Sequence, residues 1–136
     1  MKSVIITGGT KGIGLHIAEE FLKNDFHVTV ASRTGSSLPK GIEFAEVDVR
    51  NRSSVHAIVQ KVFQKQGVSD VFINCAGVSV WQPLAEIDEK FWGDMIDTNL
   101  AGTFWGCQAA AEVMIKGASI VNISSLAGKR GSANNS

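Results

Sequence analysis

The sequence predicts an α/β protein whose parallel sheet is doubly wound, with helices on both of its faces. Short apolar runs rich in β-branched residues alternate with segments whose apolar residues recur at helical spacing. A glycine-rich segment, Thr7–Gly14, separates the first apolar run from the first helical segment. Strands that alternate with helices form right-handed crossovers and a sheet that is buried on both sides. The 136 residues are the length of a single domain, which we expect to span residues 1–136.

The first part of the chain supplies three of the predicted strands. Lys2–Thr7 is the apolar run before the glycines, and the helix that follows is predicted over Gly12–Asn24. Phe26–Ala31 is short and β-branched, which is typical of a strand. Residues 35–41 are rich in Gly, Ser and Pro and predict a loop, after which Ile42–Val47 predicts the third strand.

The second part of the chain continues the same alternation. Asn51–Gln66 has helical spacing, and either Asn51 or Ser53 can act as its N-cap. Val71–Asn74 predicts a fourth strand. A helical stretch is expected from Asp88 to about Thr98, followed by a further helix to about Lys116. Ser119–Ile123 then predicts a fifth strand.

Composition and charge exclude several classes of function. Lysine and arginine together number 13, as do aspartate and glutamate, so the formal net charge of zero indicates neither a nucleic-acid partner nor an anionic membrane surface. No apolar run approaches the length of a membrane-spanning helix, and the run before the glycines is too short for a signal peptide. The two cysteines and three histidines form no metal-ligand or disulfide pattern. We therefore expect no bound metal and a reducing, cytoplasmic location.

The glycine-rich segment predicts a nucleotide site. Glycines between a strand and a helix let backbone N–H groups approach a pyrophosphate, and the helix N-terminus attracts that anion. The spacing is not that of a P-loop, because Lys11 precedes Gly12 and no Ser or Thr follows a Gly-Lys pair. Glycines at a strand end also occur as plain turn residues, and this alternative stays open at this point.

The residues after the second strand favour NADP over NAD. A dinucleotide-binding fold that prefers NAD places an acid there, about 20 residues after the glycines, to bind the ribose 2′-hydroxyl. Here the sequence is Ala31-Ser32-Arg33-Thr34, with no acid. The Arg33 guanidinium can form a bidentate hydrogen bond with a 2′-phosphate, and Lys11 in the glycine loop can reach the same phosphate. The alternative is that both cations are ordinary solvated surface charges.

Ordered motifs along the whole chain resemble those of the classical, NADP-type short-chain dehydrogenase/reductase family. Thr7-Gly8-x-x-x-Gly12-x-Gly14 is similar to the family's cofactor loop, and Asn74-Cys75-Ala76-Gly77 resembles its Asn-Asn-Ala-Gly motif, from which Cys75 departs. Asp48-Val49 stands at the adenine-contacting position. Asn99 matches the catalytic asparagine, and Ser125, in Val121–Gly128, matches the catalytic serine. The residues expected to bind the cofactor are Gly8, Thr10, Lys11, Gly12, Ile13, Gly14, Ser32, Arg33, Asp48, Val49, Asn74, Ala76 and Gly77.

The resemblance implies a fold and a chemistry. It implies a Rossmann-type sheet with strand order 3-2-1-4-5, and hydride transfer between a nicotinamide and a carbonyl or alcohol substrate. In that mechanism Ser125 polarises the substrate oxygen and Asn99 holds a water in a proton relay. A tyrosine acts as general acid and base beside a lysine. The segment between the fourth and fifth strands helps form oligomers in the family, which implies a homo-oligomer.

Each motif also has a purely structural explanation. Asp48 can begin a turn, Asn74 can satisfy neighbouring backbone groups, Asn99 can be a polar kink between helices, and Ser125 can simply end a strand. Their placement argues for a site, because ligands of such sheets bind outside the carboxyl ends of the strands. The residues at or just beyond predicted strand ends are Thr7, Ser32, Asp48, Asn74 and Ser125.

The sequence lacks one part of the family's chemistry, because it contains no tyrosine. The family's Tyr-x-x-x-Lys motif would fall just past Ser136, and its later strands and helices are also missing. We therefore expect the N-terminal part of a longer enzyme, inactive as the 136-residue chain. The alternative is a non-catalytic NADP-binding sensor or interaction module. A flavin-binding electron carrier is a third class, disfavoured because Lys11 and Arg33 have no role with FMN.

Overall fold

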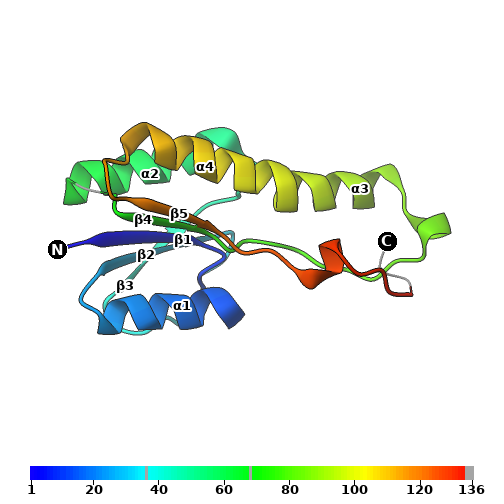
Figure 1. Cartoon of the computed structure of the whole chain (residues 1–136), viewed down its shortest axis with the longest axis horizontal. Helices are drawn as coiled ribbons and strands as arrows, with labels where there is room; N and C mark the ends of the chain where they lie inside the picture. The colour runs from blue at the N-terminus through cyan, green and yellow to red at the C-terminus, as the bar shows by residue number, and fades with distance from the viewer. Residues whose placement is uncertain (36, 68, 134–136) are drawn as a thin grey trace.

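The computed structural model describes residues 1–35, 37–67 and 69–133 of the chain. Its centre is a five-stranded parallel sheet with the order β3-β2-β1-β4-β5, as predicted (Figure 1). Every predicted strand is present, with each end within one residue of its predicted position. The strands are β1 (Ser3–Thr7), β2 (His27–Ser32), β3 (Ile42–Glu46), β4 (Val71–Asn74) and β5 (Ser119–Asn122).

Helices lie on both faces of the sheet. Figure 1 shows α1 (Gly12–Lys23) on one face, and α2 (Arg52–Gln66) with α4 (Gly102–Val113) on the other. The helix α3 (Glu89–Ile96) joins α4 through a π-helical turn, η2 (Asp97–Ala101), and extends beyond the carboxyl ends of the strands. None of the helices in the described part of the chain is both long enough and apolar enough to cross a membrane.

The ends of the helices have clear local causes. The Asn51 side chain caps α2 by accepting a hydrogen bond from the Ser54 N–H at 3.1 Å, and the Asp88 carboxylate caps α3 in the same way. Gly67 ends α2 in the left-handed region, at φ +72°. The last helix stops at Val113, short of the predicted Lys116, because Met114 adopts extended backbone.

The sheet separates two groups of buried apolar residues. Alternate strand residues point to opposite faces, so Ile5 and Phe72 pack beneath α2 and α4, while Ile6 and Ile73 pack beneath α1. The β1 strand is buried along its whole length and pairs with both β2 and β4. The glycine-rich segment is therefore attached to the most deeply buried strand of the sheet.

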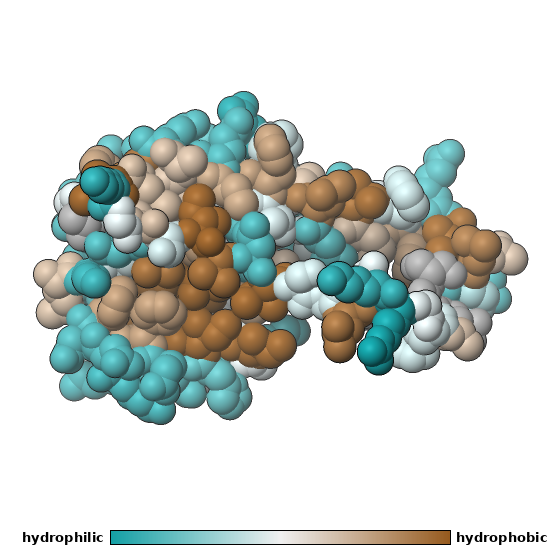
Figure 2. All heavy atoms as spheres, viewed as in Figure 1, coloured by the Kyte–Doolittle hydropathy of each residue, from teal (hydrophilic) through white to brown (hydrophobic). Residues whose placement is uncertain are grey.

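The strand β5 departs from the prediction that both faces of the sheet are covered. All four of its residues are exposed. The helix α1 contacts β1, β2 and β3, so it does not extend over β5. Figure 2, viewed from the β5 edge, shows apolar side chains gathered there, and Ile120 and Val121 are 37% and 42% exposed.

Candidate nucleotide site at the carboxyl ends of the strands

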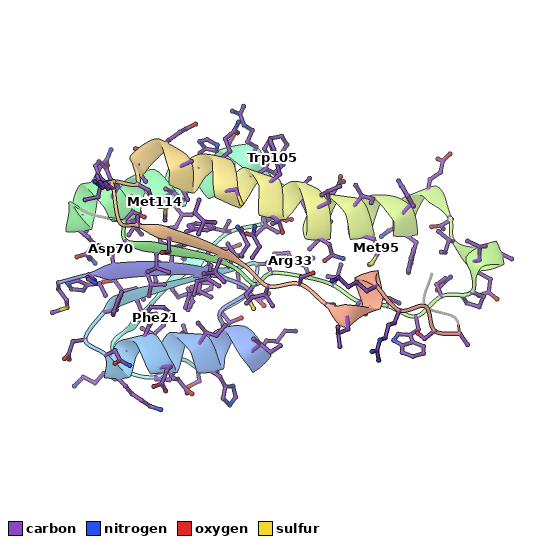
Figure 3. All side chains as sticks on the ribbon, viewed as in Figure 1. Phe21, Arg33, Asp70, Met95, Trp105 and Met114 are labelled. Atoms are coloured by element: carbon purple, nitrogen blue, oxygen red, sulfur yellow. The ribbon has the colours of Figure 1, made fainter. Side chains whose placement is uncertain are left out.

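A cavity of about 620 Å³ lies where the carboxyl ends of the central strands meet. The strand register brings these ends together, because Thr7 pairs with Ala31 on one side and with Asn74 on the other. The volume lies in the range of small-molecule and cofactor pockets. Figure 3 shows Arg33 at this end of the sheet and Asp70 at the opposite end.

Twelve of the thirteen residues expected to bind a cofactor line this cavity, Asn74 being the exception. Seven further residues line the cavity without having been expected from the sequence. Most of them are sequence neighbours of predicted residues at strand ends. The rule that ligands bind outside the carboxyl ends of the strands could therefore have identified them as well. These further residues are Ala31, Thr34, Val47, Cys75, Val78, Thr98 and Ile123.

The glycine loop forms one wall and brings the N-terminus of α1 to the cavity. Gly8 and Gly12 have positive φ angles, +67° and +53°, which glycine adopts without a steric penalty. The Gly8 N–H donates to the Ala31 carbonyl at 2.7 Å, which fixes the loop against β2. A Cβ atom at Gly14 would lie 2.3 Å from the Gly8 carbonyl oxygen, so only glycine permits this turn. Gly12, Ile13 and Gly14 place the first turn of α1 beside the cavity, where its N–H groups attract anions.

The buried hydroxyl of Thr7 ties the glycine loop to the segment after β4. Its Oγ1 accepts hydrogen bonds from the N–H groups of Cys75 and Ala76, both at 3.2 Å, and donates to the Ile73 carbonyl at 3.5 Å. A Cβ at Gly8 would lie 2.7 Å from the Cα of Ala76, so the two segments are in direct backbone contact. Burial raises the pKa of the Cys75 thiol, which therefore forms a neutral part of the wall.

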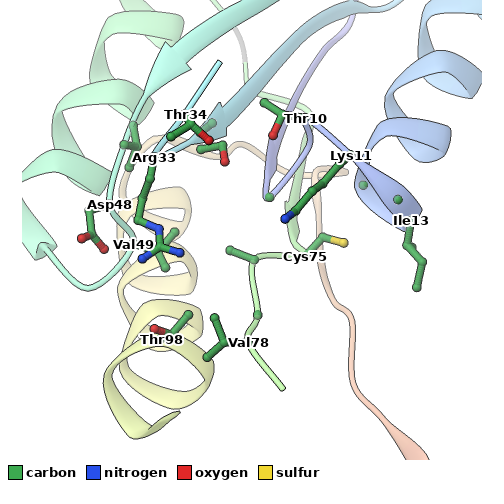
Figure 4. A pocket seen from close by; sticks show the side chains of 18 of the residues that line it. Thr10, Lys11, Ile13, Arg33, Thr34, Asp48, Val49, Cys75, Val78 and Thr98 are labelled. Atoms are coloured by element: carbon green, nitrogen blue, oxygen red, sulfur yellow. The ribbon is translucent and has the colours of Figure 1, made fainter. Parts of the chain in front are cut away.

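Two cations face the cavity from opposite walls. Figure 4 shows Lys11 and Arg33 pointing toward each other across it. Within the described parts of the chain, neither the Lys11 ammonium nor the Arg33 guanidinium hydrogen-bonds or ion-pairs with another residue. No aspartate or glutamate follows β2 before residue 43. The cavity therefore presents two available positive groups to an anion.

Asp48, at the β3 side of the cavity, belongs to a network of charges. Arg50 contacts its carboxylate through Nε, at 3.0 and 3.1 Å, and through Nη2, at 2.7 Å. The Arg50 Nη1 atom also donates to the Asp94 carboxylate of α3 at 3.3 Å, and Lys90 Nζ lies 2.6 Å from the same carboxylate. The hydrogen bond from Arg50 holds the pKa of Asp48 below its usual value, and the hydrogen bond from Lys90 does the same to the pKa of Asp94.

The side chain of Asn74 points away from the cavity and into the interface between the sheet and α4. Its Nδ2 donates to the Asn122 Oδ1 at 2.9 Å and lies 3.5 Å from the Cys107 sulfur. Gly106 leaves room for it, since a Cβ there would lie 2.1 Å from the Asn74 Oδ1. Asn74 therefore connects β4, β5 and α4 through side-chain contacts, and not through the backbone groups that the structural alternative named.

Asn99 lies in the π-helical turn η2 and clamps the loop after β4. Its Oδ1 accepts from the Val78 N–H and its Nδ2 donates to the Val78 carbonyl, both at 2.9 Å. Its own backbone carbonyl accepts from the Thr103 hydroxyl at 2.9 Å. Both polar atoms of the Asn99 side chain are therefore hydrogen-bonded to the backbone of Val78. Val78 itself lines the cavity.

Replacing Asn99 with alanine is expected to release this loop. Val78 is partly exposed, so water replaces the two lost hydrogen bonds, and the expected loss of unfolding free energy is about 1 kcal/mol. The urea midpoint of unfolding and the NMR shift of the Val78 amide proton measure the effect. Asn99→Asp is the matched control, because its carboxylate keeps an acceptor for the Val78 N–H. An unchanged Val78 amide shift in Asn99→Ala would contradict the clamp.

Ser125 follows β5 on an exposed segment and does not line the cavity. Its Oγ accepts from the Ala127 N–H at 3.1 Å and caps the short helical turn Leu126–Gly128. Asn99 is held by Val78 and Ser125 by Ala127, so the two side chains predicted to be catalytic have different hydrogen-bond partners in the described structure.

Comparison with known proteins shows what this chain resembles. Residues 2–136 match the sequence pattern of the family described as short chain dehydrogenase. A 3-oxoacyl-(acyl-carrier-protein) reductase of Chlamydia muridarum is 37% identical, with 96% of this chain and 58% of the reductase aligned. A 3beta-hydroxysteroid dehydrogenase of Mediterraneibacter gnavus is 32% identical, with 96% of this chain and 51% of that protein aligned. The chain thus spans a little over half the length of these relatives.

Solved structures share the fold at similar coverage. The aldohexose dehydrogenase of Thermoplasma acidophilum, in ligand-free form, superposes with a TM-score of 0.87 at 34% identity, covering 92% of this chain and 49% of the dehydrogenase. The structure of ElxO with NADP bound superposes with a TM-score of 0.86 at 36% identity, covering 98% of this chain and 59% of ElxO.

Proposed function

Because the chain belongs to the short chain dehydrogenase family of oxidoreductases, we propose that it binds NADP(H) in the cavity at the strand ends. The observation that carries the proposal is a pair of cations, Lys11 and Arg33, on opposite walls of that cavity, neither of which has a hydrogen-bond or ion-pair partner among the described residues. A 2′-phosphate requires such groups, whereas an NAD site has an acid after its second strand. The likeness to ElxO, solved with NADP bound, supports the same ligand.

The residues present fit a dinucleotide. The contact between Gly8 and Gly14 admits no Cβ atom, which lets the loop backbone and the first turn of α1 approach a pyrophosphate. On the β3 side, Asp48 and Val49 line the part of the cavity where the family resemblance implies adenine. The segment after β4 supplies Ala76 and Gly77 on the remaining wall.

We propose further that the chain forms the cofactor-binding part of an oxidoreductase acting on a carbonyl or alcohol. The nicotinamide supplies or accepts the hydride when it is bound. Ser125 would hydrogen-bond the substrate oxygen, and Asn99 would contribute to a proton relay. The relatives named as reductases and dehydrogenases support this substrate class.

Assembly and location form part of the same proposal. Large apolar side chains on α3, η2 and α4 are exposed, including Trp92 at 63%, Leu100 at 64% and Phe104 at 58%. Several large apolar side chains exposed on neighbouring helical segments favour a homo-oligomer. Cys75 and Cys107 are both free thiols, in keeping with the cytoplasm. We treat residues 1–136 as one domain, because the sheet joins all five strands.

A second function, a non-catalytic NADP(H)-binding module, is favoured by one observation. The 136-residue sequence contains no tyrosine, which is the family's general acid and base. Loss of a general acid lowers turnover by about 10²- to 10⁴-fold. We therefore expect this chain alone to bind the dinucleotide without reducing a carbonyl compound.

Isothermal titration of the chain with NADP⁺ and with NAD⁺ tests the proposal. We expect NADP⁺ to bind at least about tenfold more tightly, because the 2′-phosphate gains charge-assisted hydrogen bonds. Equal affinities would overturn the assignment of NADP(H). Consumption of NADPH with a carbonyl substrate, followed at 340 nm and dependent on Ser125, would overturn the expected inactivity.

A further inference from the structure

Arg50 stands beside the cavity without lining it. Its guanidinium is shared between two carboxylates that come from distant parts of the chain. It forms three contacts of 2.7 to 3.1 Å with Asp48, which follows β3, and one of 3.3 Å with Asp94, on α3. The two carboxylates in turn raise the pKa of Arg50, with the Asp48 hydrogen bond as the main cause.

Arg33 lies within electrostatic range of the same two carboxylates. Its positive charge helps to lower the pKa of both Asp48 and Asp94. It nevertheless forms no hydrogen bond with either of them. Arg50 makes three contacts with Asp48, and Arg50 and Lys90 each contact one oxygen of Asp94. The Arg33 guanidinium therefore stays available on the cavity wall.

We propose that Arg50 is a specificity-determining residue that acts through position: it holds Asp48 and Asp94 so that Arg33 remains free to bind a 2′-phosphate. The inference rests on the proposed binding of NADP(H). Arg50 itself does not touch the ligand in this arrangement. Its positive charge offsets the two carboxylates beside the phosphate position, which would otherwise repel a phosphate.

The charge balance shows why Arg50 is needed. The four groups Lys90, Asp94, Arg50 and Asp48 carry two positive and two negative charges, so their sum is zero. Without Arg50 the sum is −1, next to Arg33. The freed Asp48 carboxylate can then pair with Arg33, or it can remain unpaired near the phosphate. Either outcome weakens the binding of a 2′-phosphate and leaves the binding of an unphosphorylated ribose largely unchanged.

The test uses two small adenosine ligands that differ only in the 2′-phosphate. Titration calorimetry gives the dissociation constants of adenosine 2′,5′-bisphosphate and of 5′-AMP for the wild-type chain and for Arg50→Gln. We expect Arg50→Gln to weaken the binding of the bisphosphate about tenfold more than it weakens the binding of 5′-AMP, because both ligands share the adenine and only the bisphosphate carries the 2′-phosphate. Adding Asp94→Asn to Arg50→Gln removes one of the two acids and should restore part of the lost affinity.

Arg52→Gln is the matched control. It removes the same charge two residues away, where Arg52 hydrogen-bonds Gln108 at 2.8 Å and lies over the Trp105 ring. Its ratio of affinities should equal that of the wild-type chain. If the wild-type chain prefers the bisphosphate and Arg50→Gln has the same ratio of dissociation constants, the role proposed for Arg50 is wrong. The proposed preference for NADP(H) is then unaffected. A wild-type chain that binds both ligands equally would overturn the proposed NADP(H) preference and this inference with it.

Discussion

Replacing Arg33 with aspartate is expected to reverse the preference of this protein between the two dinucleotides. The substitution removes a cation that stands free on the cavity wall and places a carboxylate there. The dissociation constant for NADP⁺ should rise about 100-fold, because a charge-assisted hydrogen bond is lost and a repulsion is added. The affinity for NAD⁺ should increase, since the new acid can accept a hydrogen bond from the ribose 2′-hydroxyl.

Titration calorimetry with NADP⁺ and NAD⁺ measures both constants. Lys116→Asp is the control: it makes the same change of charge on an exposed turn that precedes β5, at the other end of the sheet. Its ratio of affinities should match that of the wild-type chain. If Arg33→Asp keeps the wild-type ratio as well, Arg33 does not contact the 2′-phosphate.

Gly14→Ala is expected to cause the largest loss of stability among single-methyl additions at the site. The new Cβ would lie 2.3 Å from the Gly8 carbonyl oxygen and 3.0 Å from the Gly9 Cα, and all of these atoms belong to backbone that cannot rotate away. Overpacking of this kind costs about 3 kcal/mol of unfolding free energy. Because the displaced atoms form the glycine loop, nucleotide affinity should fall at the same time.

Urea unfolding, monitored by far-UV circular dichroism, gives the free energies of unfolding of the variants and of the wild-type chain. Gly93→Ala is the matched control, as Gly93 lies in α3 and a Cβ there meets no atom within 4 Å. Alanine in a helix is favoured over glycine, so this variant should gain about 0.5–1 kcal/mol. Equal stabilities of the two variants would show that the loop and α1 do not pack as closely as the structure has them.

The strands and most of the cavity could be predicted because their signals are local. A short β-branched run such as Phe26–Ala31 predicts a strand by itself, and Asp48 and Arg33 are found by counting from a strand end. The sequence predicts Asn51 or Ser53 as the N-cap of α2, and Asn51 is the residue that forms the capping hydrogen bond.

The direction of Asn74 and the role of Arg50 could not be predicted, for two different reasons. A strand buried on both faces shows no polar and apolar alternation, so nothing in Val71–Asn74 tells which face the Asn74 side chain takes. Arg50 meets Asp94 across 44 residues of chain. Such a pair depends on how α3 is placed against the end of β3, and that is a property of the folded chain alone.

Among the described residues, the sheet divides the buried apolar side chains unequally, with twelve in the group between the sheet and α2 and α4, and six in the group between the sheet and α1. The smaller group should open more readily, so the amides of α1 are expected to exchange with solvent through local unfolding before those of α2 and α4. A ligand that binds only the closed form raises the cost of that opening in proportion to the logarithm of its concentration. A dinucleotide bound at the N-terminus of α1 would therefore stabilise the side of the sheet that has fewer buried apolar residues.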